Sequence, residues 1–157
     1  MISIGAVARK ALMTAVLGLA SACITIPTYD AKTDDLLTGL QSDTDSLIGR
    51  LQGAYDITNA PNKACAYSSN KQAADQLTVS LSVLGTRIDA LAHNASSHAA
   101  FGHLSETYKS FFTAWGDAET RRADHCVLPA LLATDQQALD SAVGGLLKLE
   151  LAKKGSL

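Results

Sequence analysis

The sequence predicts an all-α domain, an antiparallel up-down-up-down four-helix bundle in which one disulfide joins the first and third turns. Apolar residues recur at alternating three- and four-residue steps in four separate stretches, the spacing that lines one face of a helix. Aromatic residues make up only 5% of the chain while alanine and aliphatic residues dominate, which is typical of helices rather than sheets. Two cysteines fall in segments expected to connect helices.

The N-terminal residues 1–22 are predicted to be an export signal. Arg9 and Lys10 form a short positive region, and the apolar run 11–19 is too short to cross a bilayer, which needs about 20 residues. Small residues then lead into a cysteine, in the order Leu19-Ala20-Ser21-Ala22-Cys23. This run resembles the lipobox of bacterial lipoproteins, with alanine in place of the usual leucine three residues before the cysteine. The resemblance implies that Cys23 becomes the lipid-bearing N-terminus.

The location of the protein follows from the same resemblance. Ile24 rather than aspartate follows the cysteine, which in lipoproteins of enteric-type bacteria implies an outer-membrane anchor facing the periplasm. Ordinary signal peptidase cleavage after Ala22 is the alternative, giving a soluble periplasmic protein with Cys23 as a single thiol; a cell-surface location is also open. We favour lipidation because an exposed thiol in an oxidising compartment is a liability. Residues 23–33 are expected to be a flexible tether, and residues 34–153 the bundle.

The first helix is expected to begin at Thr33, which can cap it, with acidic residues in the first turn. Its apolar stripe comprises Leu37, Leu40, Thr44, Leu47, Leu51 and Ala54. The segment 58–62 should end it, because Pro61 lacks an amide hydrogen and restricts the residue before it.

The second helix has the most regular stripe. It comprises Ala74, Leu77, Leu81, Leu84, Ile88, Leu91 and Ala95, and Ser68 or Ser69 is the expected cap. The apolar register then resumes out of phase at Phe101, which predicts a tight reversal at residues 94–97.

The third helix carries nearly all the aromatic residues of the domain. Its stripe comprises Phe101, Leu104, Tyr108, Phe111, Trp115 and Ala118, and it should end near Arg121. Such residues either fill the core or line a ligand pocket, and core filling is the favoured interpretation.

The fourth helix has two possible starts. Pro129 is well placed in a first turn, whereas Thr134 with Gln137 forms a capping box that would shorten the helix by about a turn. Its stripe comprises Leu128, Leu132, Asp135, Leu139, Ala142, Leu146 and Leu149.

Cys65 and Cys126 are predicted to form a disulfide. The first and third turns of an up-down-up-down bundle share one end, and these two cysteines lie in those turns. The bond would close a loop of about 62 residues and stabilise the fold by about 4 kcal/mol on the chain-entropy account. The chain has no Cys-x-x-Cys motif, so the disulfide is interpreted as structural rather than catalytic.

The end of the domain that carries the disulfide is predicted to bind a partner protein. Six polar or basic residues gather there, namely Lys63, Tyr67, Lys71, Arg121, Arg122 and His125. A solvated tip without a partner is the alternative. Nucleic acid is not an expected partner, because removing Arg9 and Lys10 from 13 basic residues leaves 11 against 15 acidic ones, a balance of −4 with no clustered positive face.

The leading functional hypothesis is a lipid-anchored periplasmic accessory or adaptor protein that binds another envelope protein, as an assembly factor, secretion pilot or immunity protein does. No catalysis, cofactor or metal is expected. His93, His98 and His103 are five residues apart, not the three or four that place ligands on one helix face. The alternative is a small-molecule, haem or metal carrier that uses the bundle core, although the chain lacks a Cys-x-x-Cys-His attachment motif.

Overall fold

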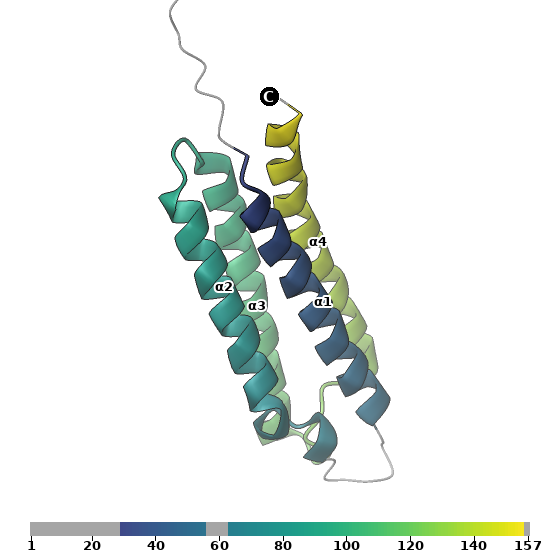
Figure 1. Cartoon of the computed structure of the whole chain (residues 1–157). Helices are drawn as coiled ribbons and strands as arrows, with labels where there is room; N and C mark the ends of the chain where they lie inside the picture. The colour runs from purple at the N-terminus through teal and green to yellow at the C-terminus, as the bar shows by residue number, and fades with distance from the viewer. Residues whose placement is uncertain (1–28, 56–62, 156–157) are drawn as a thin grey trace, which may run out of the picture.

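A computed structural model describes residues 29–55 and 63–155 of the chain, and within these ranges it is helical without any strand. The elements are α1 (Ala31–Ala54), η1 (Lys63–Cys65), η2 (Ser68–Asn70), α2 (Lys71–Ala90), α3 (Ala95–Arg121) and α4 (Pro129–Lys154) (Figure 1). The all-α prediction is therefore confirmed for the described residues. The predicted export signal, Cys23, most of the tether and the stop at Pro61 lie outside them.

The first helix begins earlier than predicted. α1 starts at Ala31, and its N-cap is Asp30, whose carboxylate accepts the backbone N–H of Lys32 at 3.4 Å. Thr33, the predicted cap, is buried inside the helix and its hydroxyl donates to Asp30 at 2.6 Å. The last residues assigned to the tether, 31–33, are therefore helical.

The start of α2 also differs from the prediction. Ser68 and Ser69 lie in η2, and α2 begins after Asn70 without a side-chain cap. The Asn70 side-chain amide instead donates to the carbonyls of Ala64 and Ala66 at 2.9 and 3.0 Å. This residue therefore ties η1 to η2 rather than capping a helix.

The reversal between α2 and α3 occupies residues 91–94, not the predicted 94–97. His93 adopts a left-handed backbone with φ 58°, and the Asn94 side chain donates to the carbonyl of Ile88 at 3.3 Å. The prediction was wrong because Leu91 and Ala95 continue the apolar spacing of α2 across the turn.

The ends of the last two helices resolve the remaining alternatives. α3 ends at Arg121 as expected. α4 begins at Pro129, and the Thr134 hydroxyl donates to the carbonyl of Ala130 at 3.0 Å within the helix, so the shorter α4 is ruled out.

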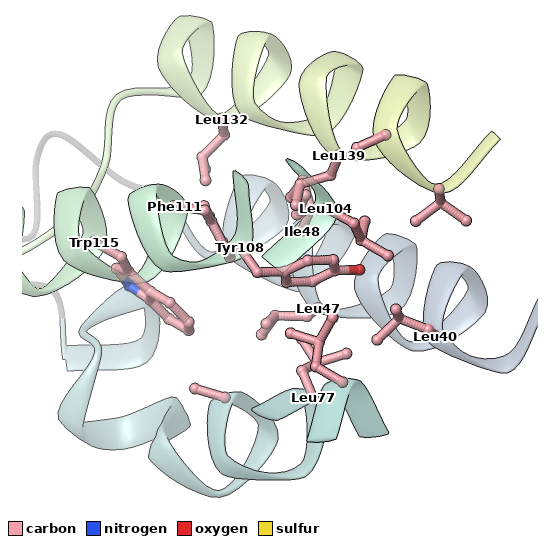
Figure 2. Close-up of a cluster of buried hydrophobic side chains, with 14 of the residues drawn as sticks. Leu40, Leu47, Ile48, Leu77, Leu104, Tyr108, Phe111, Trp115, Leu132 and Leu139 are labelled. Atoms are coloured by element: carbon pink, nitrogen blue, oxygen red, sulfur yellow. The ribbon is translucent and has the colours of Figure 1, made fainter. Parts of the chain in front are cut away.

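The four helices share one core. α1 and α3 each contact both α2 and α4, and buried side chains from all four surround the Tyr108 ring (Figure 2). Trp115, Tyr108 and Phe111 are the largest fully buried side chains, whereas Phe101 is only partly buried. Most of the predicted aromatic stripe therefore fills the core.

The domain has two ends, which we call the N-terminal pole and the disulfide pole. The N-terminal pole comprises the start of α1, residues 91–94 and the end of α4. The disulfide pole comprises residues 63–70 with η1 and η2, the start of α2, the end of α3 and residues 122–128; Figure 1 shows the two poles at opposite ends. No helix in the described part of the chain is long and apolar enough to cross a membrane.

Candidate functional site

The disulfide pole is fixed by the predicted covalent bond. Cys65 in η1 is bonded to Cys126 in the α3–α4 connection, with a Cα–Cα distance of 5.4 Å, and both residues are buried. The predicted pairing is confirmed.

Trp115 supports the same pole from within α3. Its indole N–H donates to the carbonyl of Cys65 at 2.8 Å, so a core side chain holds the turn that carries the disulfide. Tyr67 packs edge-on against this indole with ring centroids 5.1 Å apart. Tyr67, a predicted partner-binding residue, is therefore partly engaged by the fold.

A second set of contacts joins η2 to the end of α3. The Ser68 backbone N–H donates to the Glu119 carboxylate at 2.9 Å, and the Ser68 hydroxyl donates to it as well. These bonds hold the pKa of Glu119 below its ordinary value. The Glu119 backbone carbonyl in turn lies 2.5 Å from Nδ1 of His125, which has a left-handed backbone with φ 58°. His125 therefore ties the α3–α4 connection back to the last turn of α3.

Arg122 also serves the fold of this pole. Its guanidinium donates to both carboxylate oxygens of Asp124 at 2.9 and 2.7 Å and lowers the pKa of that carboxyl. Asp124 also accepts the backbone N–H of Cys126 at 3.2 Å. This ion pair positions the chain next to the disulfide.

The other three predicted residues are exposed. On α2, Lys71 pairs with Asp75 at 2.6 Å, and on α3, Arg121 lies 3.5 Å from Asp117. Each pair is exposed and spans one turn of its own helix. Lys63 is exposed in η1. The six predicted residues thus belong to one pole, and Lys63, Lys71 and Arg121 are those whose side chains are most available to a partner.

A groove of about 840 Å³ lies between α2 and α3. Its apolar and aromatic lining includes Tyr67, Leu81, Gly85, Phe101, Tyr108, Phe112 and Gly116. A Cβ on Gly85 would lie 2.6 Å from Cζ of Phe101, so this ring packs directly against the backbone of α2. Hydroxyl side chains form much of the remaining wall, among them Ser82 and Ser105.

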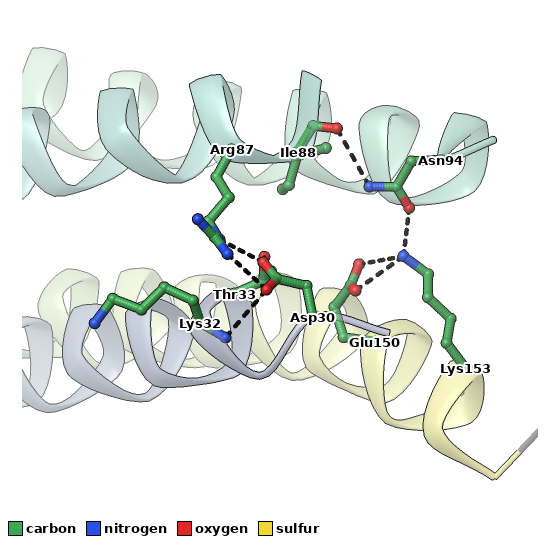
Figure 3. Close-up of polar contacts among 8 residues, drawn as sticks. All are labelled: Asp30, Lys32, Thr33, Arg87, Ile88, Asn94, Glu150 and Lys153. Carbon is green, nitrogen blue, oxygen red and sulfur yellow. Dashed lines mark hydrogen bonds and ion pairs between the residues drawn. The ribbon is translucent and has the colours of Figure 1, made fainter. Parts of the chain in front are cut away.

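The N-terminal pole contains a buried ionic cluster that the sequence analysis missed (Figure 3). Lys153 is 7% exposed, and its ammonium lies 2.8 Å from both carboxylate oxygens of fully buried Glu150. It also donates to the Ser97 hydroxyl at 2.8 Å and to the Asn94 side-chain carbonyl. Glu150 and Lys153 continue the inward spacing of α4 beyond Leu146, and this was the available sequence signal.

The start of α1 is tied to the same pole by a second ion pair. Arg87 of α2 donates to both carboxylate oxygens of Asp30, at 2.7 Å through one of its terminal nitrogens (Figure 3). This pairing holds the pKa of Asp30 well below its ordinary range.

The histidines are not brought together as ligands. Nε2 of His98 lies 2.9 Å from the Asp89 carboxylate, with both side chains exposed. Among the described residues, no group of three or more His, Cys, Asp or Glu side chains is arranged to hold a metal ion.

Comparison with known proteins gives no relative: the chain matches no protein-family model, and neither the curated proteins nor the solved structures contain a significant match.

Proposed function

We propose that this chain is a lipid-anchored, non-enzymatic accessory protein of the bacterial envelope that binds another envelope protein through its disulfide pole. The lipid on Cys23 would hold it at the outer membrane, facing the periplasm. The lipobox-like run before Cys23 supports the anchor.

We also infer that the helices form the antiparallel up-down-up-down bundle. The packing supports it, because in the described residues each helix backbone runs close to two others, whereas the backbones of α1 and α3, and of α2 and α4, do not approach closely. Side chains alone bridge α1 and α3, as in the Thr44–Tyr108 bond. The bonds between Asp30 and Arg87, and between Lys153 and Asn94, join helix ends that such a bundle brings to one pole.

The observation that carries the binding proposal is a rigid pole with exposed cations. The disulfide, the Trp115 bond and the Arg122–Asp124 pair fix the backbone there. Because the backbone is already ordered, Lys63 and Arg121 would meet a partner at a lower entropic cost than residues on a loose loop.

Metabolic labelling with palmitate tests the anchor. We expect the full chain to incorporate the label and to fractionate with the outer membrane. Cys23→Ser should abolish both, and a labelled Cys23→Ser variant would contradict the anchor.

Site-specific photocrosslinking in living cells tests the binding surface. A photoreactive residue at position 63 or 121 should give one discrete adduct. The same residue at Lys148, exposed on α4 outside the pole, is the matched control and should give none. Equal adducts from all three positions, or none from 63 and 121, would count against this surface. Arg122 and His125 are avoided because they hold the pole together.

The groove between α2 and α3 favours a second candidate function, a carrier of a small apolar molecule. Its volume of about 840 Å³ falls in the range of ligand pockets, and aromatic rings line it. The core itself is filled by side chains, so this groove replaces the core as the site of the carrier hypothesis.

A groove-filling variant tests the carrier. A Cβ on Gly116, which lines the groove, or on Gly102, which does not, meets nothing within 4 Å, so a side chain can be added at either position without a clash at its first carbon. With a dansylated long-chain fatty acid as the probe, Gly116→Leu should abolish the fluorescence enhancement and Gly102→Leu should retain it. Equal binding by both variants would reject the groove as a site.

A further inference from the structure

The outer face of α2 carries a ridge of four residues at four-residue steps. In order they are Asp75, Val79, Val83 and Arg87, and we call this set the α2 ridge. Val79 is 56% and Val83 48% exposed, which places them among the most exposed large apolar side chains in the described residues. No charged residue occurs between Asp75 and Arg87. An exposed apolar patch without charges is typical of the centre of a protein interface.

Hollows flank the α2 ridge on both sides. On one side lies the groove shared with α3, to which Ser82 and Thr86 contribute. On the other side a hollow of about 440 Å³ between α1 and α2 has Leu36 and the ridge residues Val83 and Arg87 in its wall. It shares Ser82 and Thr86 with the groove. The same patch therefore offers both a ridge and a space to receive one. An interface between two identical chains requires this property, because each copy must supply both halves of the fit.

The charges at the two ends of the ridge are also complementary to a second copy. When two α2 helices run antiparallel with their midpoints at residue 81, Asp75 faces Arg87 of the second copy, and Val79 faces Val83 of the second copy. Within its own chain Asp75 already pairs with Lys71, and Arg87 pairs with Asp30. The side chains of Asp75 and Arg87 are nevertheless 57% and 41% exposed, so a second copy would extend each pair into a network of alternating charges. A parallel pairing would instead set each charge against its own kind.

We propose that the chain forms a symmetric dimer in which the α2 ridges of two copies pack antiparallel. The ridge is about 18 Å long, from 12 residues at 1.5 Å each, so the interface is small and the affinity micromolar rather than nanomolar. The two-fold axis lies perpendicular to α2. With that axis along the membrane normal, both N-terminal poles are equally close to a bilayer, which is compatible with two lipid anchors.

Sedimentation velocity on the full chain in mild detergent tests the dimer. We expect a monomer–dimer equilibrium in the micromolar range. Val79→Glu with Val83→Glu should weaken association by at least about tenfold, because buried carboxylates would face each other across the axis. Leu131→Glu with Leu151→Glu is the matched control. These residues are 54% and 46% exposed on α4, outside the ridge, and their substitution should leave association unchanged.

A charge reversal tests the antiparallel register. Asp75→Arg sets arginine against Arg87 of the second copy and should weaken the dimer. In a parallel dimer it would merely exchange one like-charged pair for another. Each variant should remain folded, because the substituted side chains are exposed. Circular dichroism melting checks this. A monomeric wild-type chain, a dimer insensitive to the valine substitutions, or an unchanged dimer with Asp75→Arg would each overturn the proposal.

Discussion

Two buried hydroxyl groups in the core depend on each other. The Thr44 hydroxyl donates to the carbonyl of Leu40 at 2.7 Å and lies 2.5 Å from the phenol oxygen of Tyr108. Burial raises the pKa of Tyr108 to about 12, consistent with a phenol removed from water.

Substitution of Thr44 should therefore leave the phenol without a partner. Thr44→Val is expected to cost about 1–3 kcal/mol of unfolding free energy, because a buried polar group loses its hydrogen bond. Adding Tyr108→Phe removes the unpaired hydroxyl, so the double variant should lose less than the two single losses combined. Urea unfolding of the four proteins measures this coupling, and strictly additive losses would contradict it.

Asp135 gives a prediction about pH. Burial raises the pKa of Asp135, so its charged form is disfavoured in the folded state. Its contribution to stability is present below the pKa of an unfolded aspartate and is lost as the pH rises through the raised folded value. Asp135→Asn should therefore raise the melting temperature at about pH 7 and have little effect at about pH 3.

The control for this experiment is Asp43→Asn, at an exposed position on α1. It should give no gain at either pH. An equal gain from the two variants would show that amide substitution, rather than burial of Asp135, is the cause.

At the scale of elements, two glycines on the α2–α3 groove should respond differently to alanine. Gly116→Ala is expected to stabilise α3 by about 1 kcal/mol, because the new methyl group meets nothing within 4 Å and alanine favours helix. Gly85→Ala should gain less or destabilise, because its Cβ would press on the Phe101 ring. Thermal unfolding measures both, and equal gains would show that Phe101 moves aside freely.

The ionic cluster of the N-terminal pole links α4 to α3. Glu150→Gln should cost about 3–5 kcal/mol, because it leaves the Lys153 ammonium buried without a counter-charge. Glu150→Leu with Lys153→Met removes both charges and should cost less than Glu150→Gln alone. Denaturant unfolding compares the two, and a double variant as unstable as the single one would contradict this account.

Apolar spacing predicted the four helices well, but not every boundary. The periods of α1, α3 and α4 place Leu37, Leu104 and Leu146 in the core as expected. The α2–α3 turn was misplaced because its position depends on the left-handed backbone of His93 and the Asn94 bond, which no periodicity encodes. Serine and threonine residues that were predicted to cap helices were also misleading. Thr33 bonds Asp30, Ser68 bonds Glu119, and Thr134 bonds the carbonyl of Ala130 within α4.

At the scale of the whole molecule, the disulfide links the segment before α2 to the connection before α4. Cys65→Ala with Cys126→Ala should cost about 4 kcal/mol, since the unfolded chain is no longer constrained by a loop of about 62 residues. Thermal unfolding of the double variant should match wild type measured in strong reductant. A double variant as stable as the oxidised wild type would contradict this expectation.

The meeting of the two cysteine-bearing connections was predictable from the sequence, but the structural roles of the residues around them were not. Cysteine positions indicated which connections meet, and the disulfide confirms that they do. The sequence offered no means of distinguishing Arg121, which remains exposed, from Arg122, which braces Asp124 beside the disulfide. Arg121 is the last residue of α3, whereas Arg122 follows it with an extended backbone (φ −107°, ψ 143°). This change in backbone conformation, which the sequence does not reveal, directs the Arg122 guanidinium to Asp124.

The indole bond to the disulfide turn has a practical consequence. Trp115 is the sole tryptophan of the chain, and it touches both the Cys65 carbonyl and the Tyr67 ring. Ultraviolet emission excited at long wavelength therefore comes from one position only. An optical trace of the native protein follows the bridged end of the molecule continuously and without any added dye.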